Sequence, residues 1–256
     1  MINRLLFSFR KILLVNALIF AAMGQKKLQR FADLKTFSNV LEYPGNMQGR
    51  WKDFFKNDHP LVLELACGRG EYTVGLSRLY PSQNHIGIDI KGNRIYIGAK
   101  KCLEEKITNA AFLRTQIEML PDYFAPGEVE QIWITFPDPQ LRPSKAKKRL
   151  THPRFLRIYK TVLIENGLIH LKTDSPALYD FTKKVIALYQ LTILEDSSDI
   201  YKLSRLKAEL MIKTHYENLD IAKSRKLHYL RFSLPAVIPD EDEKLQEIVK
   251  NEGETN

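Results

Sequence analysis

Apolar runs of strand length alternate with segments of helical spacing over most of this chain. The runs predict seven strands, at residues 61–65, 85–90, 110–114, 131–136, 167–173, 191–195 and 226–234. The segments between them predict helices near residues 71–80, 92–106 and 177–189. Strands that alternate with helices indicate an α/β fold with a doubly wound, mostly parallel sheet, whose ligands bind beyond the carboxyl ends of the strands.

The first predicted strand of this sheet ends in a glycine turn. Residues 61–70 read Leu-Val-Leu-Glu-Leu-Ala-Cys-Gly-Arg-Gly, which is an apolar strand with one acid, Glu64, followed by closely spaced glycines and a helix-compatible segment. Gly68 and Gly70 lack a Cβ, so the backbone can adopt positive φ and approach a ligand closely. We expect a flat or charged ligand to lie across this turn.

The ligand is not predicted to be a nicotinamide dinucleotide, because two of the three glycine positions of that fingerprint hold Ala66 and Glu71. The second strand ends in Asp89, and an acid at this place can accept hydrogen bonds from both hydroxyls of a ribose. With Glu64 and the Gly-x-Gly turn, the pattern resembles the S-adenosylmethionine site of class I methyltransferases. The alternative is a βαβ unit whose turn is only structural.

A second candidate centre follows the fourth strand. Pro137 and Pro139 flank Asp138 and hold its carboxylate on a stiff loop at the ligand-binding edge of the sheet. Residues 142–160 then contain eight Lys or Arg residues and no acid. This basic loop favours phosphate binding beside a catalytic mouth, and a solvated surface loop is the alternative.

Composition and charge narrow the class of partner. The 256 residues suit one domain, and 44% hydrophobic residues suffice for one core. The net charge is +9, yet residues 240–256 hold seven acids and two lysines, so the rest of the chain carries +14. Such a charge favours a polyanion. Cys67 and Cys102 form no metal-ligand or disulfide pattern, which predicts no metal and a reducing, cytoplasmic location.

The two ends are expected to lie outside the folded domain. Residues 1–22 include an apolar stretch that is too short for a membrane span, and we expect the biological start at Met23 and no membrane association. We expect the domain to cover residues 23–234, with a basic, aromatic-rich arm from 23 to about 57 that packs beside the sheet. Residues 235–256 are predicted to form an acidic, flexible tail.

Five motifs of this chain occur in the order found in bacterial tRNA (guanine-N7)-methyltransferases, the TrmB family. They are the glycine-turn stretch, Gly87-Ile88-Asp89-Ile90, Phe136-Pro137-Asp138-Pro139 with the basic loop, Lys172-Thr173-Asp174, and Thr214-His215-Tyr216-Glu217. The resemblance spans residues 24–233. It implies the seven-stranded class I methyltransferase sheet with an antiparallel last strand, and methyl transfer from S-adenosylmethionine to N7 of a tRNA variable-loop guanosine, at position 46.

The resemblance also implies roles for individual residues. The expected cofactor contacts are Glu64, Gly68, Gly70, Asp89, Gln116 and Asp138, and Asp138 also takes the catalytic role. The expected substrate contacts are Arg142, Asp174, Thr214, His215, Tyr216 and Glu217, and the expected RNA phosphate contacts are Lys145, Lys147, Lys148 and Arg149. The chain departs from the family pattern at Ala66, Gln116, Gln140, Arg142 and His215, and Ala66 fits this turn only if its φ is negative.

The carboxylates of Asp138, Asp174 and Glu217 can accept hydrogen bonds from N1–H and the exocyclic amine of guanine, which adenine cannot supply. Two other functions stay open. One is a methyltransferase that acts on a protein or a small molecule, and the other is a non-catalytic RNA-binding protein that retains the sheet. No obligate protein partner is expected, and related enzymes act as monomers or homodimers.

Overall fold

The structure is a computed structural model that describes residue 25 and residues 28–214, 217 and 226–254. The expected extension at residues 1–22 and two of the expected substrate contacts, His215 and Tyr216, lie outside the described residues. Within the described ranges, every helix is too short or too polar to cross a lipid bilayer.

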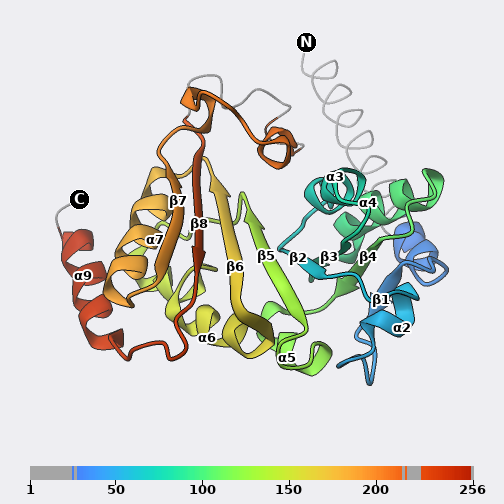
Figure 1. Cartoon of the computed structure of the whole chain (residues 1–256), viewed down its shortest axis with the longest axis horizontal. Coiled ribbons are helices and arrows are strands. Elements are labelled where there is room, and N and C mark those ends of the chain that lie inside the picture. The colour runs from blue at the N-terminus through green and yellow to red at the C-terminus, as the bar shows by residue number, and fades with distance from the viewer. Residues whose placement is uncertain (1–24, 26–27, 215–216, 218–225, 255–256) are drawn as a thin grey trace, which may run out of the picture.

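One eight-stranded sheet forms the centre of the molecule (Figure 1). Its strand order is β1-β4-β3-β2-β5-β6-β8-β7. The strands are β1 Val40–Glu42, β2 Leu61–Leu65, β3 Asn84–Asp89, β4 Ala110–Arg114, β5 Val129–Thr135, β6 Leu163–Thr173, β7 Thr192–Ser197 and β8 His228–Ser233. All neighbouring pairs are parallel except those that β8 makes with β6 and β7. This confirms the predicted α/β sheet with an antiparallel last strand.

The eighth strand was not predicted. β1 contributes only three residues, and Val40 to Glu42 pair in parallel with Phe112 to Arg114 of β4. Its side chains are all half-buried, so it has neither the alternation nor the apolar run by which a strand is recognised in a sequence. The N-terminal arm therefore does more than pack beside the sheet, since part of it is the edge strand.

Helices lie between the strands and pack on both faces of the sheet. They are α2 Trp51–Phe55, α3 Glu71–Leu79, α4 Gly92–Glu104, α5 Leu120–Tyr123, α6 Pro153–Val162, α7 Pro176–Leu188 and α9 Asp242–Glu254. Short 3₁₀ turns are η1 Ile117–Met119, η2 Pro143–Lys148, η3 Ile200–Lys202 and η4 Ala208–Met211. The α7 helix begins where Ser175 Oγ accepts a hydrogen bond from Leu178 N, which satisfies one donor of its first turn.

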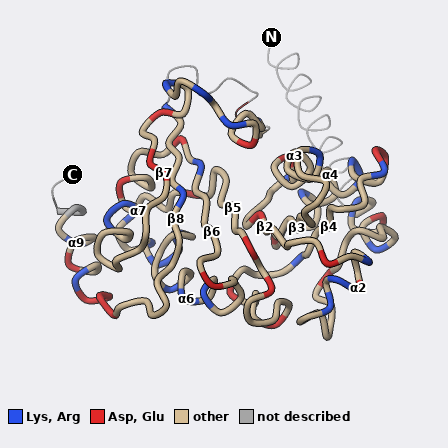
Figure 2. The backbone as a smooth tube through the Cα atoms, in the orientation of Figure 1, with Lys and Arg blue, Asp and Glu red and all other residues tan. Residues whose placement is uncertain are grey.

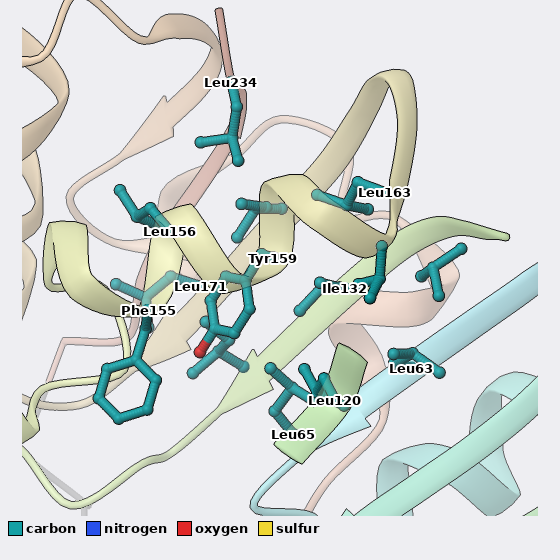
Figure 3. Close-up of a cluster of buried hydrophobic side chains, with 14 of the residues drawn as sticks. Leu63, Leu65, Leu120, Ile132, Phe155, Leu156, Tyr159, Leu163, Leu171 and Leu234 are labelled. Atoms are coloured by element: carbon teal, nitrogen blue, oxygen red, sulfur yellow. The ribbon is translucent and has the colours of Figure 1, made fainter. Parts of the chain in front are cut away.

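The two faces of the central strands differ in chemistry. Leu63 and Leu65 of β2 and Ile132 of β5 point into a wholly apolar core built with α5 and α6 (Figure 3). The alternate positions of β2, β5 and β6 face the other side of the sheet, where polar side chains lie among apolar ones such as Trp133. The polar side chains there include Glu64, Thr135, His170 and Lys172. Because side chains alternate along a strand, one face supplies packing and the other supplies buried functional groups.

The basic segment at residues 142–160 is only partly a loop. Its second half is the helix α6, which packs on the sheet through Phe155, Leu156 and Tyr159. Two of its cations are ion-paired, Arg154 with Glu118 at 2.8 Å and Arg157 with Asp242 at 2.8 Å. The prediction that this whole segment is a loop was therefore wrong, because an amphipathic helix with a cationic outer face was taken for loop. Phosphate binding by the segment stays a prediction.

The prediction of a flexible tail after residue 234 was also wrong. Residues 242–254 form α9, which packs against η2, and Leu245 and Val249 are buried. The carboxylate of Asp242 accepts hydrogen bonds from both terminal nitrogens of Arg157, at 2.9 and 2.8 Å, and from Tyr189 Oη at 2.6 Å. These donors lower the pKa of Asp242 to about 2. The prediction failed because it followed the acidic composition and overlooked Leu245 and Val249, two apolar residues at helical spacing.

The substitution Leu245→Ala tests the docking of α9. The side chain is 2% exposed, so its loss should lower the free energy of unfolding by about 2–4 kcal/mol. Chemical denaturation measures this change, with the exposed Lys250→Ala on the same helix as the control. Equal denaturation midpoints for the two variants would contradict the docking of α9 and favour a flexible tail.

Candidate functional site

The carboxyl ends of four parallel strands meet at one edge of the sheet, where two adjoining pockets open. The residues that follow β2, β3, β4 and β5 line them, and Ala66 belongs to both. This is the edge at which an α/β sheet binds its ligands, because no side chain of the sheet itself fills the space beyond the strand ends.

The first pocket is the more polar of the two. It is lined by Glu64, Ala66, Cys67, Gly68, Arg69, Glu71, Arg94, Thr135, Phe136 and Thr214. Two acidic residues and two arginines therefore line the same space. Such a pocket complements a zwitterion, because an ammonium group can lie against the acids while a carboxylate lies against an arginine.

The second pocket combines an apolar wall with a few polar groups. It is lined by Ala66, Asp89, Ile90, Thr115, Gln116, Ile117, Glu118, Leu150 and Phe155. Branched and aromatic side chains suit the faces of a flat ring, whereas Asp89 and Gln116 can bind the polar edge of a nucleoside. Two of the expected cofactor contacts thus lie together here.

The glycine turn between the pockets has the expected geometry. Gly68 and Gly70 have positive φ, +56° and +73°. A Cβ added at Gly70 would lie 2.4 Å from a ring carbon of Phe112, so this glycine is required by packing. A Cβ at Gly68 would meet nothing closer than 4.0 Å, so Gly68 faces open space from which a ligand can approach the backbone.

Asp89 also holds this turn. Its Oδ2 accepts a hydrogen bond from Gly68 N at 2.9 Å, and its Oδ1 accepts one from Lys91 N at 2.8 Å. The carboxylate oxygens keep further lone pairs for ligand hydroxyls. Asp89 therefore shapes the turn and lines the second pocket at once.

Glu64 is the most deeply buried acid of the site, at 3% exposure. Its Oε2 accepts hydrogen bonds from Thr73 N at 2.7 Å and Thr73 Oγ1 at 2.5 Å, and its Oε1 accepts one from Thr135 Oγ1 at 3.0 Å. Burial raises the pKa of Glu64 to about 7, and the hydrogen bonds from Thr73 and Thr135 oppose this rise. A cationic ligand group in the first pocket would compensate the charge.

Asp138, the expected catalytic residue, lies on an exposed loop and lines neither pocket. Its Oδ1 accepts a hydrogen bond from Gln140 N at 3.0 Å, which closes a turn around Pro139. The loop begins at Phe136, which lines the first pocket and has a φ of +45°. Asp138 is therefore two residues from the pocket wall, and its loop starts from a left-handed backbone conformation that costs a residue with a Cβ about 1 kcal/mol.

The substrate contacts expected beyond the loop are distributed over three elements. Arg142 is exposed at the start of η2, and Asp174 is half-buried after β6. The cap of α7 is Ser175, so Asp174 does not serve as that cap. Thr214 lines the first pocket, whereas Glu217 is held by Lys172 Nζ at 3.2 Å and Tyr201 Oη at 2.8 Å.

The four residues expected to contact phosphate do not form one set. Lys145, Lys147 and Lys148 are exposed on η2. Arg149 is only 6% exposed, donates hydrogen bonds to the carbonyl oxygen of Gln140 at 3.2 and 3.3 Å, and lies 4.3 Å from the ring centre of Phe181. Its guanidinium group holds the Asp138 loop in place, so Arg149 is not a surface phosphate contact.

The structure adds pocket residues that the sequence reasoning missed. Arg94, Thr135 and Phe136 join the first pocket, and Ile117 and Phe155 join the second. No local pattern distinguishes these side chains from ordinary surface or core residues. Lys172 could have been identified from the sequence, since a lysine within an apolar strand is unusual. Among the described residues, no group of three or more His, Cys, Asp or Glu side chains could hold a metal ion.

Ala66 has a φ of +54°, so the condition of a negative φ at this position is not met. The left-handed conformation costs a residue with a Cβ about 1 kcal/mol. Ala66→Gly should therefore raise the free energy of unfolding by up to about 1 kcal/mol. Thermal denaturation provides the measurement. Ala99→Gly in the buried interior of α4 should change stability in the opposite direction, and a destabilised A66G variant would contradict the assignment of strain.

The raised pKa of Glu64 predicts a pH-dependent stability. The carboxyl is protonated in both the folded and the unfolded chain below pH 4.5, and between pH 4.5 and about 7 the unfolded chain loses its proton first. Glu64 should therefore lower the free energy of unfolding by about 3 kcal/mol as the pH rises through this window. Denaturation of the wild type and Glu64→Gln at pH 4.5 and 8 checks this, because the variant lacks the titration. A constant difference between the two proteins would disprove the shift.

Comparison with known proteins gives strong matches in sequence. A family model described as "Putative methyltransferase" matches residues 58–230. The tRNA (guanine-N(7)-)-methyltransferase of Bacteroides fragilis is 46% identical over 222 residues, which cover 83% of this chain and 87% of that protein. The protein of the same name from Porphyromonas gingivalis is 49% identical over 213 residues, covering 78% of this chain and 86% of that protein.

Solved structures support the fold. The 16S rRNA methyltransferase KamB superimposes with a TM-score of 0.57 at 14% identity, over 77% of this chain and 99% of that chain. A 30S ribosomal A1408 methyltransferase from an uncultured bacterium gives a TM-score of 0.55 at 19% identity, over 72% of this chain and 92% of that chain. At these identities the likeness concerns the class I methyltransferase fold alone. By its sequence matches, the chain belongs to the tRNA (guanine-N7)-methyltransferase family.

Proposed function

We propose that this protein transfers the methyl group of S-adenosylmethionine to N7 of a variable-loop guanosine in tRNA, at position 46. The observation that carries the proposal is the pair of pockets that share Ala66, one zwitterionic and one suited to a nucleoside. S-Adenosylmethionine has this composition, an amino acid joined through sulfur to a nucleoside. The residues proposed to bind its two ends line two adjoining pockets at the strand ends.

The residues of the first pocket fit the amino acid end of this donor. The buried carboxylate of Glu64 can receive the ammonium group, and Arg94 or Arg69 can receive the carboxylate. Gly68 leaves its backbone open to the ligand. In the second pocket, Asp89 can accept the ribose hydroxyls, and Gln116 can both donate to and accept from the adenine edge.

The chemistry asks little of the protein beyond placement and charge. When bound, the donor supplies an electrophilic methyl group on a sulfonium. Guanine N7 already has a free lone pair and no proton to lose, so no activated nucleophile is needed. The chain has to align the base with the donor and to compensate the positive charge that develops on the purine. We assign the second task to the carboxylate of Asp138, which follows the pocket residue Phe136 by two positions.

Selection of guanine falls to acceptors near the reaction centre. Asp138 and Asp174 can accept hydrogen bonds from guanine N1–H and its exocyclic amine. Glu217 is less suited to this role than the sequence indicated, because its side chain is only 6% exposed and its carboxylate is ion-paired with the buried Lys172. The proposed readout of guanine therefore depends first on the two aspartates.

The surface beside the pockets fits a tRNA partner. Lys145, Lys147 and Lys148 on η2 are exposed next to the Asp138 loop, and Figure 2 shows further Lys and Arg along the segment between β7 and β8. Lysines on such a surface neutralise phosphates and release counterions. The enzyme is proposed to act in the cytoplasm, without an obligate protein partner, as a monomer or a homodimer.

The test uses purified protein, labelled S-adenosylmethionine and tRNA transcripts that differ only at the variable-loop guanosine. We expect label in 7-methylguanosine, and none when that guanosine is replaced. Asp138→Asn should reduce the rate about 100-fold, since it removes the charge that stabilises the transition state. Asp122→Asn, at an exposed site on α5, is the control and should leave the rate unchanged.

Other outcomes would point to the alternatives. Donor binding without label in tRNA would favour a protein or small-molecule substrate. Absence of donor binding would favour a non-catalytic RNA-binding protein.

A further inference from the structure

Lys172 is the most completely buried charged residue that the reaction described above does not use. It lies near the end of β6, with no exposed surface. A lysine ammonium removed from water is costly unless oxygen acceptors replace its hydration. The groups that surround this ammonium therefore indicate its structural role.

Three oxygen acceptors surround the Lys172 ammonium, and all three belong to one segment. Nζ donates to the carbonyl oxygen of Leu210 at 2.9 Å, to the carbonyl oxygen of Ile212 at 3.0 Å and to Glu217 Oε2 at 3.2 Å. The side chain of Glu217 is itself only 6% exposed. Burial lowers the pKa of Lys172, and the charge of Glu217 and its hydrogen bond oppose this shift.

The same ammonium also contacts the wall of the first pocket. Nζ lies 5.4 Å from the ring centre of Phe136 and 5.3 Å from that of Tyr72, both within cation–π range. The backbone oxygen of Lys172 accepts a hydrogen bond from Phe136 N at 2.8 Å. Lys172 thus joins Phe136, where the Asp138 loop begins, to the segment that places Thr214 in the same pocket.

Other contacts also hold this segment, among them the hydrogen bond that Tyr80 Oη donates to Glu209 Oε2 at 2.8 Å. Glu217 N donates to Thr214 Oγ1 at 3.3 Å, Tyr201 Oη donates to Glu217 Oε1 at 2.8 Å, and Ile212 packs against the face of Gly75 in α3. Leu210 is buried against the sheet, whereas Met211 and Lys213 are exposed. Because the backbone carbonyls of residues 210 and 212 bind a charge, their position depends on that charge as well as on the apolar packing of Leu210 and Ile212.

We propose that Lys172 is a positioning residue of the methyl-transfer site, which fixes Thr214 and Glu217 against Phe136 through its buried ammonium. In this account Glu217 is the counter-ion that makes the buried lysine tolerable, and it acts through Lys172 rather than on guanine. The effect on methyl transfer rests on the proposed function, whereas the anchoring itself does not.

The experiment compares Lys172→Met with Lys183→Met in the full chain. Methionine keeps the length of the side chain and removes its charge. Lys183 is a matched control, because it forms a lysine–carboxylate pair with Asp196 at 2.6 Å on the partly exposed surface of α7. Hydrogen exchange of amides 208–214 and the kinetics of methyl transfer to tRNA are measured for both variants.

K172M should increase exchange of amides 208–214 at least about 10-fold while the β2 and β5 amides keep their protection, because hydrogen bonds to a charged donor are lost. The value of kcat/KM should fall about 10-fold or more, and K183M should change neither quantity. Adding Glu217→Gln to K172M should recover part of the protection, since it removes the unpaired buried carboxylate. A lysine that merely fills space would give no such rescue.

Unchanged exchange in K172M would overturn the proposal, as would faster exchange spread evenly over the sheet. If K172M does not fold, Tyr201→Phe gives the same test in a milder form. Tyr201 is 55% exposed, and loss of its hydroxyl should loosen the same amides and lower kcat/KM a few-fold. If the wild-type protein is inactive on tRNA and K172M still exchanges amides 208–214 selectively faster, the proposed function is rejected and the anchoring by Lys172 stands.

Discussion

The burial of one carboxylate at the end of β2 is the constraint on which the rest of the site depends. Glu64 can occupy this place because Thr73 of α3 and Thr135 of β5 donate hydrogen bonds to it. Those bonds join a helix and two strands at the point where the glycine turn begins. The raised pKa of Glu64 shows that the compensation is incomplete, so the pocket favours a cationic group.

Lys172 has the complementary role on the same face of the sheet. It lies opposite Thr135 in the register of β5 and β6, and Thr135 binds Glu64, so the buried acid and the buried base are linked through β5. The acid shapes the pocket from the side of β2, and the base holds the segment that borders it from the side of β6. Both charges are tolerated because hydrogen-bond partners replace their hydration, Thr73 and Thr135 at Glu64 and three oxygen acceptors at Lys172.

Sequence patterns were reliable where one element carried the whole signal. The seven longer strands and the glycine turn were predictable, because apolar runs, turn glycines and the acid at the end of β3 are local features. The three-residue strand β1, the helix α6 with its cationic face and the acidic helix α9 were missed or misread. In each of these, contacts from distant segments decide the structure, as when Arg157 and Tyr189 bind Asp242.

The sequence by itself determined the fold class, the family and the edge of the sheet at which ligands bind, since these follow from periodicity and from motifs in a fixed order. Only the tertiary structure decided which charged side chains are available to a ligand. It buried Arg149 beneath the Asp138 loop, joined Glu217 to Lys172 and gave Ala66 a positive φ. The physical reason is that desolvation and hydrogen bonding depend on neighbours far along the chain, which local sequence does not specify.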